Sequence, residues 1–134
     1  MKPNFLLNTK NKKDVYPIII ISIAIIIFFY KIIFGRESYF IGDIYTQFFP
    51  WKTFLKNSVE NGSVPYWSPF NYSGTPFLAD IQKGAFYPPG IIFYVFDFPL
   101  AFKIYILFHF FILGTSSFFL LKSMGFHSSS SVIG

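Results

Sequence analysis

The chain has 134 residues, of which 53% are hydrophobic and 24% aromatic, while only 13% carry a charge. A soluble domain of this length would not normally hold 21 Phe with so little charge on its surface, so we favour a membrane protein. The chain contains no Cys, which excludes a disulfide framework, a thiolate nucleophile and a Cys-based metal site. Its net charge of +5 does not indicate nucleic-acid binding, because the basic residues lie at the ends of apolar segments and form no patch.

The first apolar run extends from Tyr16 to Phe34 and would reach about 28 Å as a helix, close to the hydrocarbon thickness of a bilayer. Pro17 falls in the first turn, where its missing N–H costs little. A secretory signal would have a shorter apolar region, and no small-residue cleavage pattern follows Phe34. We therefore expect an uncleaved transmembrane helix over residues 16–34, preceded by a cytoplasmic segment, residues 1–15.

The second apolar run extends from Leu100 to Leu121 and would reach about 33 Å, enough to cross a bilayer with some tilt. The run from Ile91 to Phe98 is too short to cross, and Pro99 interrupts it, so we expect an interfacial or re-entrant piece there. Residues 122–134 hold a serine run before apolar residues resume. They are expected to form a cytoplasmic turn that leads to a truncated third span.

The basic residues predict the orientation. Before the first run the charges are Lys2, Lys10, Lys12 and Lys13 against Asp14, whereas residues 35–99 hold more acidic than basic side chains. The positive-inside rule places the N-terminus in the cytoplasm and residues 35–99 outside. The predicted fold is an all-α, multi-pass protein of the cell membrane. Its two transmembrane helices flank an external loop with juxtamembrane or interfacial helices.

Apolar residues recur at helical spacing in the first part of the external loop. They are Ile44, Phe48, Trp51, Leu55 and Val59, and the opposite side carries Thr46, Gln47, Lys52, Thr53, Lys56 and Glu60. The pattern predicts an amphipathic helix that breaks or starts at Pro50 and ends near Gly62. Two interpretations have equal weight and are compatible: the helix lies in the outer headgroup layer, or it packs on other protein.

The second part of the loop, Ser63 to Gly90, is rich in proline, glycine and aromatic residues, which favours fixed turns over regular structure. Its aromatic side chains suit an interface or stacking on sugar rings, although an aromatic belt at the membrane surface is the favoured explanation for any single one of them. They are Trp67, Phe70, Tyr72, Phe77, Phe86 and Tyr87.

Two carboxylates are candidates for chemistry. Asp43 follows the first apolar run and precedes the amphipathic helix, so it could act as a general base toward a hydroxyl acceptor or hold a divalent cation. The alternative for Asp43 is a helix N-cap. Asp80 is the second candidate, and a solvated turn residue is the favoured alternative for it. The candidate substrate contacts are Gln47, Trp51, Trp67, Asp80, Gln82 and Tyr87.

An ordered series of short blocks resembles the N-terminal signature of the bacterial YfhO family of membrane proteins. The blocks are Gly42-Asp43, Gln47-Phe48-Phe49-Pro50-Trp51, Pro65-Tyr66-Trp67-Ser68-Pro69-Phe70, Gly74-Thr75-Pro76-Phe77-Leu78-Ala79-Asp80 and Phe86-Tyr87-Pro88-Pro89. That family is similar to the GT-C superfamily of glycosyltransferases, which use sugars linked to polyprenyl phosphate. Ser68 and Gly90 depart from the family pattern, in which Asn is usual at both places.

The resemblance implies a longer, multi-span enzyme of the cell envelope, of which this chain is an N-terminal fragment that is inactive alone. It implies that Asp43 is the catalytic base or a metal ligand, and that the partners are the lipid bilayer, a polyprenyl-phosphate sugar donor and the remaining transmembrane helices. The cofactor stays open, with a divalent cation as the candidate. The alternative function is a non-enzymatic membrane transport or assembly component whose aromatic loop docks lipid or a partner.

Overall fold

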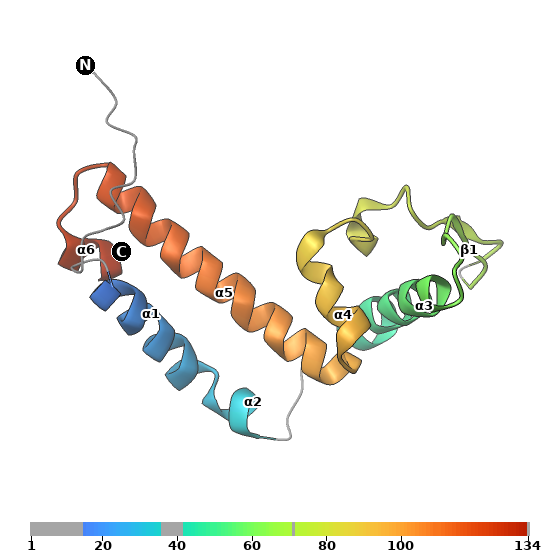
Figure 1. The fold of residues 1–134 in the computed structure, drawn as a ribbon, viewed down its shortest axis with the longest axis horizontal. Coiled ribbons are helices and arrows are strands. Elements are labelled where there is room, and N and C mark those ends of the chain that lie inside the picture. Colours follow the sequence, from blue (N-terminus) through green and yellow to red (C-terminus); the bar gives the residue numbers. More distant parts are fainter. Residues whose placement is uncertain (1–14, 36–41, 71, 134) are drawn as a thin grey trace, which may run out of the picture. The chain divides into compact units, whose positions relative to one another are not determined.

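The computed structural model describes residues 15–35, 42–70 and 72–133, which are mostly helical (Figure 1). The chain divides into two compact units, one made of residues 1–34 and 107–134 and the other of residues 35–106. The predicted helical class is confirmed. Residues 1–14 of the predicted cytoplasmic segment 1–15, and residues 36–41 of the predicted external loop, lie outside the described residues.

In the first unit, the apolar run at the N-terminus forms α1 (Val15–Phe28) and α2 (Tyr30–Phe34), which meet at Phe29. Phe29 is buried and its ring lies 4.8 Å from that of Phe110, centroid to centroid. The backbone N–H of Ile33 still donates to the carbonyl of Phe29 at 2.9 Å. The predicted helix over residues 16–34 is therefore present as two pieces with a break at a buried aromatic anchor.

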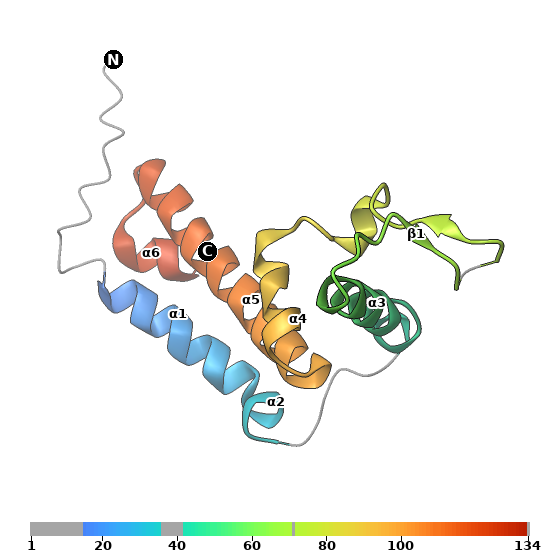
Figure 2. The same cartoon turned by 45° about the vertical axis from the view of Figure 1, so that its right-hand side comes forward.

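The C-terminal part of α5 (Phe98–Ser123) packs along α1 in this unit (Figures 1 and 2). The approach is close at Gly114, because a Cβ built there would lie 2.7 Å from Cγ2 of Ile21. Small residues permit such contact between apolar helices. The short helix α6 (Ser128–Ile133) contacts α1, in the segment where a third span was predicted to begin.

Within the described residues, α5 is the one helix long and apolar enough to cross a membrane, by length and composition. It extends two residues beyond each end of the predicted second span, residues 100–121. The helix α1 has 14 residues and is shorter than a bilayer core requires. Many apolar side chains of the unit are exposed, among them Ile27 at 66% and Leu120 at 62%. The crossing of a membrane by either helix stays a prediction.

The second unit begins with a π-helical turn, η2 (Ile44–Phe48), that continues into α3 (Phe49–Glu60). Pro50 explains this start, because it has no N–H to donate to the carbonyl of Thr46 and its ring would crowd that carbonyl in an α-helix. Gly62, with a φ of +67°, follows the end of α3, where its N–H donates to the Val59 carbonyl at 2.9 Å. Both boundaries lie where the sequence predicted them.

After α3, the chain forms a two-stranded antiparallel hairpin and a series of short helices. The strands β1 (Trp67–Ser68) and β2 (Thr75–Pro76) pair with Trp67 opposite Pro76. The 3₁₀ helices η3 (Ile81–Lys83) and η4 (Pro88–Ile91) follow, and α4 (Ile92–Val95) leads through two residues into α5. Lys103, in the first turns of α5, donates from Nζ to the Gly35 carbonyl at 3.1 Å, which joins the two ends of this unit.

Aromatic rings form the core of the second unit. The fully buried Phe77 contacts Phe54 of α3, with 5.0 Å between ring centroids, and Phe93 lies 5.5 Å from Phe98. Leu55 of α3 is 6% exposed, whereas Val59, on the predicted apolar face, is 50% exposed. The helix α3 therefore packs on other parts of the chain through Phe54 and Leu55. This is one of the two interpretations that the sequence allowed for it.

Candidate functional site

Asp43 stands directly before η2 with a helical backbone conformation, φ −62° and ψ −24°. Its side chain makes no capping hydrogen bond to the backbone. Instead, Oδ1 accepts a hydrogen bond from Nε2 of Gln47 at 3.2 Å, and both residues are exposed. The capping role considered for Asp43 is therefore absent, and its carboxylate is held by a side-chain amide one helical turn away.

Gln47 lies in the wall of a cavity of about 370 Å³ between α3 and the hairpin, which we name the α3–hairpin cavity. The lining residues are Thr46, Gln47, Pro50, Trp51, Phe54, Ser68, Phe70 and Tyr72. A mainly aromatic lining with a few hydrogen-bonding groups is typical of small-molecule sites. The Asp43–Gln47 pair connects the candidate catalytic acid to this cavity.

The ring of Trp51, in the wall of this cavity, lies near a buried cation. Lys83 is only 2% exposed, and its Nζ lies 5.9 Å from the Trp51 ring centroid and 4.8 Å from that of Phe77. The same ammonium donates to Oγ1 of Thr75 at 3.1 Å and lies 3.5 Å from Oδ2 of Asp80. These contacts join α3, the hairpin and η3 around one charge.

Asp80 and Gln82 take part in this structural arrangement rather than in the cavity lining. The Asp80 carboxylate accepts a hydrogen bond from the backbone N–H of Gln82 at 3.0 Å and so caps η3. It also faces the buried ammonium of Lys83, whereas the Gln82 side chain is exposed. Asp80 is thus more than a solvated turn residue, and its contacts among the described residues are those that order the loop.

Trp67 lies on β1, and its indole covers Gly74 so closely that a Cβ on that glycine would overlap it. Trp67 is 55% exposed and does not line the α3–hairpin cavity. Its neighbour Ser68 does line the cavity. The indole is therefore held on the hairpin, with its remaining surface facing outward.

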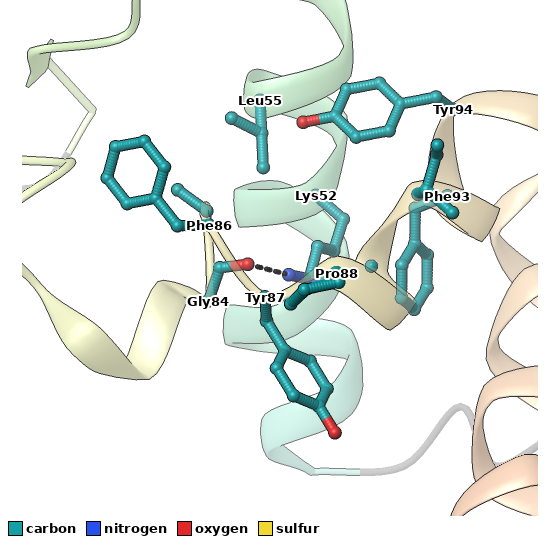
Figure 3. Close-up of a pocket in the computed structure, with 11 residues that line it drawn as sticks. Lys52, Leu55, Gly84, Phe86, Tyr87, Pro88, Phe93 and Tyr94 are labelled. Carbon is teal, nitrogen blue, oxygen red and sulfur yellow. Dashed lines mark hydrogen bonds between the residues drawn. The ribbon is translucent and has the colours of Figure 1, made fainter.

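Tyr87 lies at a second cavity, of about 220 Å³, which we name the Lys52 pocket (Figure 3). Lys52 of α3 reaches into it and donates from Nζ to the carbonyls of Lys83 at 2.9 Å and Gly84 at 3.4 Å. Burial lowers the pKa of Lys52 and raises the pKa of the Tyr94 phenol in the wall. The sequence pattern placed Lys52 on the polar side of the helix, but its long side chain turns inward.

The candidate metal role of Asp43 was tested against its surroundings. Among residues 15–35, 42–70 and 72–133, no three His, Asp or Glu side chains come together to hold an ion. A protein-only cage of oxygen ligands is thus missing from the described part of the chain. Asp43 by itself fits only the sparse coordination of Mg²⁺, which keeps several waters and takes the remaining ligands from substrate phosphates.

The predicted site residues thus separate into groups. Gln47 and Trp51 line the α3–hairpin cavity, and Asp43 is hydrogen-bonded to Gln47. Tyr87 lines the Lys52 pocket, and Trp67, Asp80 and Gln82 lie on the hairpin and at η3. The two lysines that organise the loop, Lys52 and Lys83, were not among the predicted site residues. The spacing of Asp80, Lys83 and Gly84 could have indicated the structural role of Lys83, because it is typical of a capped turn that ends at a left-handed glycine.

Comparisons of the chain with protein-family models, with curated proteins and with solved structures found no match.

Proposed function

We propose that the chain is the N-terminal part of an integral membrane glycosyltransferase. The enzyme transfers a sugar from a polyprenyl-phosphate-linked donor to a cell-envelope acceptor on the external face. The observation that carries the proposal is the hydrogen bond between Asp43 and Gln47 at the wall of the α3–hairpin cavity. An exposed, oriented carboxylate beside an aromatic cavity is an arrangement suited to activating a hydroxyl group.

In the proposed reaction, Asp43 acts as the general base. The Gln47 amide holds Oδ1, so that Oδ2 faces the acceptor hydroxyl and takes its proton. The acceptor oxygen then forms a bond to the anomeric carbon of the donor sugar. The bond between that carbon and the phosphate oxygen breaks, and polyprenyl phosphate leaves with the electron pair.

The aromatic wall of the cavity supports a sugar as the bound group. The faces of Trp51 and Phe54 offer apolar surface for the C–H side of a pyranose ring, while Thr46, Gln47 and Ser68 offer hydrogen-bonding groups for its hydroxyls. The apolar helix α5 and the exposed apolar side chains of α1 support a location in the membrane. The excess of lysine before α1 supports an external position for the site.

The experiment is an Asp43→Asn change in the full-length protein, assayed for sugar transfer in membranes. Loss of a general base is expected to slow transfer by about 10² to 10⁴-fold, with unchanged protein in the membrane fraction. Glu60→Gln is the matched control, because Glu60 is an exposed acid at the far end of α3 and lies 4.0 Å from Lys56. That variant should retain full transfer.

Normal transfer by Asp43→Asn would contradict the proposal. A tolerated Asp43→Asn change, together with faulty assembly on replacement of Trp51 or Trp67, would instead support the transport or assembly component.

A further inference from the structure

Lys52 presents a half-buried ammonium that forms no ion pair within the described residues, although Asp97 lines a neighbouring cavity with it. The ion pairs within the described part of the chain are Lys56 with Glu60 and Lys83 with Asp80, and no carboxylate lies within 4.0 Å of Lys52 Nζ. Its hydrogen-bond acceptors are the two neutral carbonyls of Lys83 and Gly84, and its Nζ also lies 5.4 Å from the ring centroid of Phe93. An ammonium has three N–H donors, so one is left for another acceptor.

The walls around this ammonium are apolar and partly open to solvent. Figure 3 shows Lys52 reaching toward Gly84 with Pro88 and Phe93 close by. Phe86 and Ile91 also line the pocket, yet they are 79% and 68% exposed. The pocket therefore combines one cation with apolar side chains that extend out to the surface.

Gly84 lies beside the cation in a left-handed conformation. Its φ is +56°, and a Cβ built there would lie 3.4 Å from Lys52 Nζ. Most larger residues would be strained in this left-handed conformation, although the Cβ itself would make ordinary van der Waals contact with the ammonium. A glycine at this place therefore adopts without strain the conformation in which its carbonyl accepts the hydrogen bond from Lys52.

An ammonium that is removed from water without an anion is costly to bury, and dipolar carbonyls compensate for only part of that cost. An anion at the open N–H would compensate for the remainder and form a charge-assisted hydrogen bond. A headgroup without a tail would leave Phe86 and Ile91 in water, whereas an attached hydrocarbon would cover them. Along the chain, the pocket residue Ile91 is followed by α4 and then by the apolar helix α5.

We propose that the Lys52 pocket binds the phosphate headgroup of an anionic lipid, with Lys52 as the counter-ion and Phe86 and Ile91 against the lipid tail. The headgroup takes the third N–H of Lys52 beside the carbonyls of Lys83 and Gly84. Binding at this pocket does not require sugar transfer by Asp43, so the two proposals are tested by different measurements.

The experiment is calorimetric titration of the full-length protein in neutral detergent with short-chain phosphatidic acid, with phosphatidylcholine of the same tails and with inorganic phosphate. Phosphatidic acid is expected to bind most tightly. Lys52→Met should weaken this binding about tenfold or more, since it removes a charge-assisted contact. Lys56→Met is the matched control, one turn further along α3 and outside the pocket, and should bind as the unchanged protein does.

A second variant keeps the test decisive if Lys52→Met does not fold. Phe86→Ser changes an exposed side chain, so it should fold normally and weaken phosphatidic acid binding without changing the response to inorganic phosphate. Equal affinity of Lys52→Met and Lys56→Met for phosphatidic acid would overturn the assignment of Lys52. Inorganic phosphate binding as tightly as phosphatidic acid, or no effect of Phe86→Ser, would overturn the role of the tail.

Discussion

Gln47 donates a hydrogen bond from its side-chain amide to the carboxylate of Asp43 across a single π-helical turn, at 3.2 Å. The wide turn arises because Pro50 disturbs the normal α-helical hydrogen bonding immediately after it. Pro50 also lines the cavity that Gln47 borders. A local backbone irregularity thus places the candidate base beside the space in which a substrate would lie.

Gln47 is expected to orient the carboxylate of Asp43 in the proposed reaction. Gln47→Leu should lower the rate of sugar transfer about tenfold, because one hydrogen bond to a charged group is lost. Its folding stability should change by less than about 0.5 kcal/mol, since both partners are exposed. The comparison is with Gln82→Leu, whose side chain is exposed and whose backbone N–H makes the bond to Asp80. Equal loss of transfer in both variants would contradict the role of Gln47.

The hairpin should depend on the absence of a side chain at Gly74. Its φ is +99°, and the indole of Trp67 occupies the space of a Cβ. Gly74→Ala should therefore displace Trp67 and shift its fluorescence. The free energy of unfolding should fall by more than the ~1–2 kcal/mol that a left-handed conformation alone costs a non-glycine residue. Gly62→Ala is the control, because its φ is +67° and nothing lies within 4 Å of a Cβ there. An unchanged Trp67 signal in Gly74→Ala would show this packing to be wrong.

Lys83 is expected to stabilise the loop through its buried ammonium. Lys83→Met keeps the apolar stem but removes the hydrogen bond to Thr75 and the charge beside Asp80. Asp80 is partly exposed and can be rehydrated, so we expect a loss of about 2 kcal/mol rather than the larger cost of a fully buried unpaired acid.

Thermal unfolding in detergent, followed by tryptophan fluorescence, measures this difference for Lys83→Met. Lys56→Met provides the baseline, because its pair with Glu60 is exposed and an exposed pair contributes little. The prediction fails if the two variants unfold at the same temperature.

The titration of Lys52 should make stability depend on pH. Burial lowers the pKa of Lys52 from its ordinary 10.5. Between the lowered pKa and 10.5 the unfolded chain binds more protons at this residue than the folded chain, so the free energy of unfolding rises with pH. Burial raises the pKa of Tyr94 above 10.0, which has the opposite effect at higher pH because the unfolded chain loses that proton first.

A Tyr94→Phe background removes the opposing contribution of Tyr94. In the Tyr94→Phe protein, the free energy of unfolding should increase with pH up to 10.5. The increase should be less steep in the Tyr94→Phe protein that also carries Lys52→Met. The measurement is denaturant unfolding at a series of pH values. Subtracting the pH profile of one protein from that of the other removes the contributions of the titratable groups that both proteins retain. Parallel pH profiles would mean that Lys52 titrates alike in the folded and unfolded chains.

Several features of the fold follow from local sequence. The apolar run around Leu100 to Leu121 predicted a long helix, and α5 contains it. Pro50 and Gly62 predicted the ends of α3, because one lacks a donor and the other adopts a left-handed conformation without steric cost. The break at Phe29 had no local signal, since its ring is fixed by Phe110, which is distant in the sequence.

By itself, the sequence determined the helical class, the aromatic character of the loop and the choice of Asp43 as the leading acid. Only the tertiary structure decided that Gln47 holds Asp43, that Asp80 caps a turn, and that Lys52 and Lys83 point inward. The physical reason is the reach of these side chains. A helical pattern assigns a lysine to the polar side, but its flexible stem can carry the ammonium to carbonyls and aromatic rings that folding brings near.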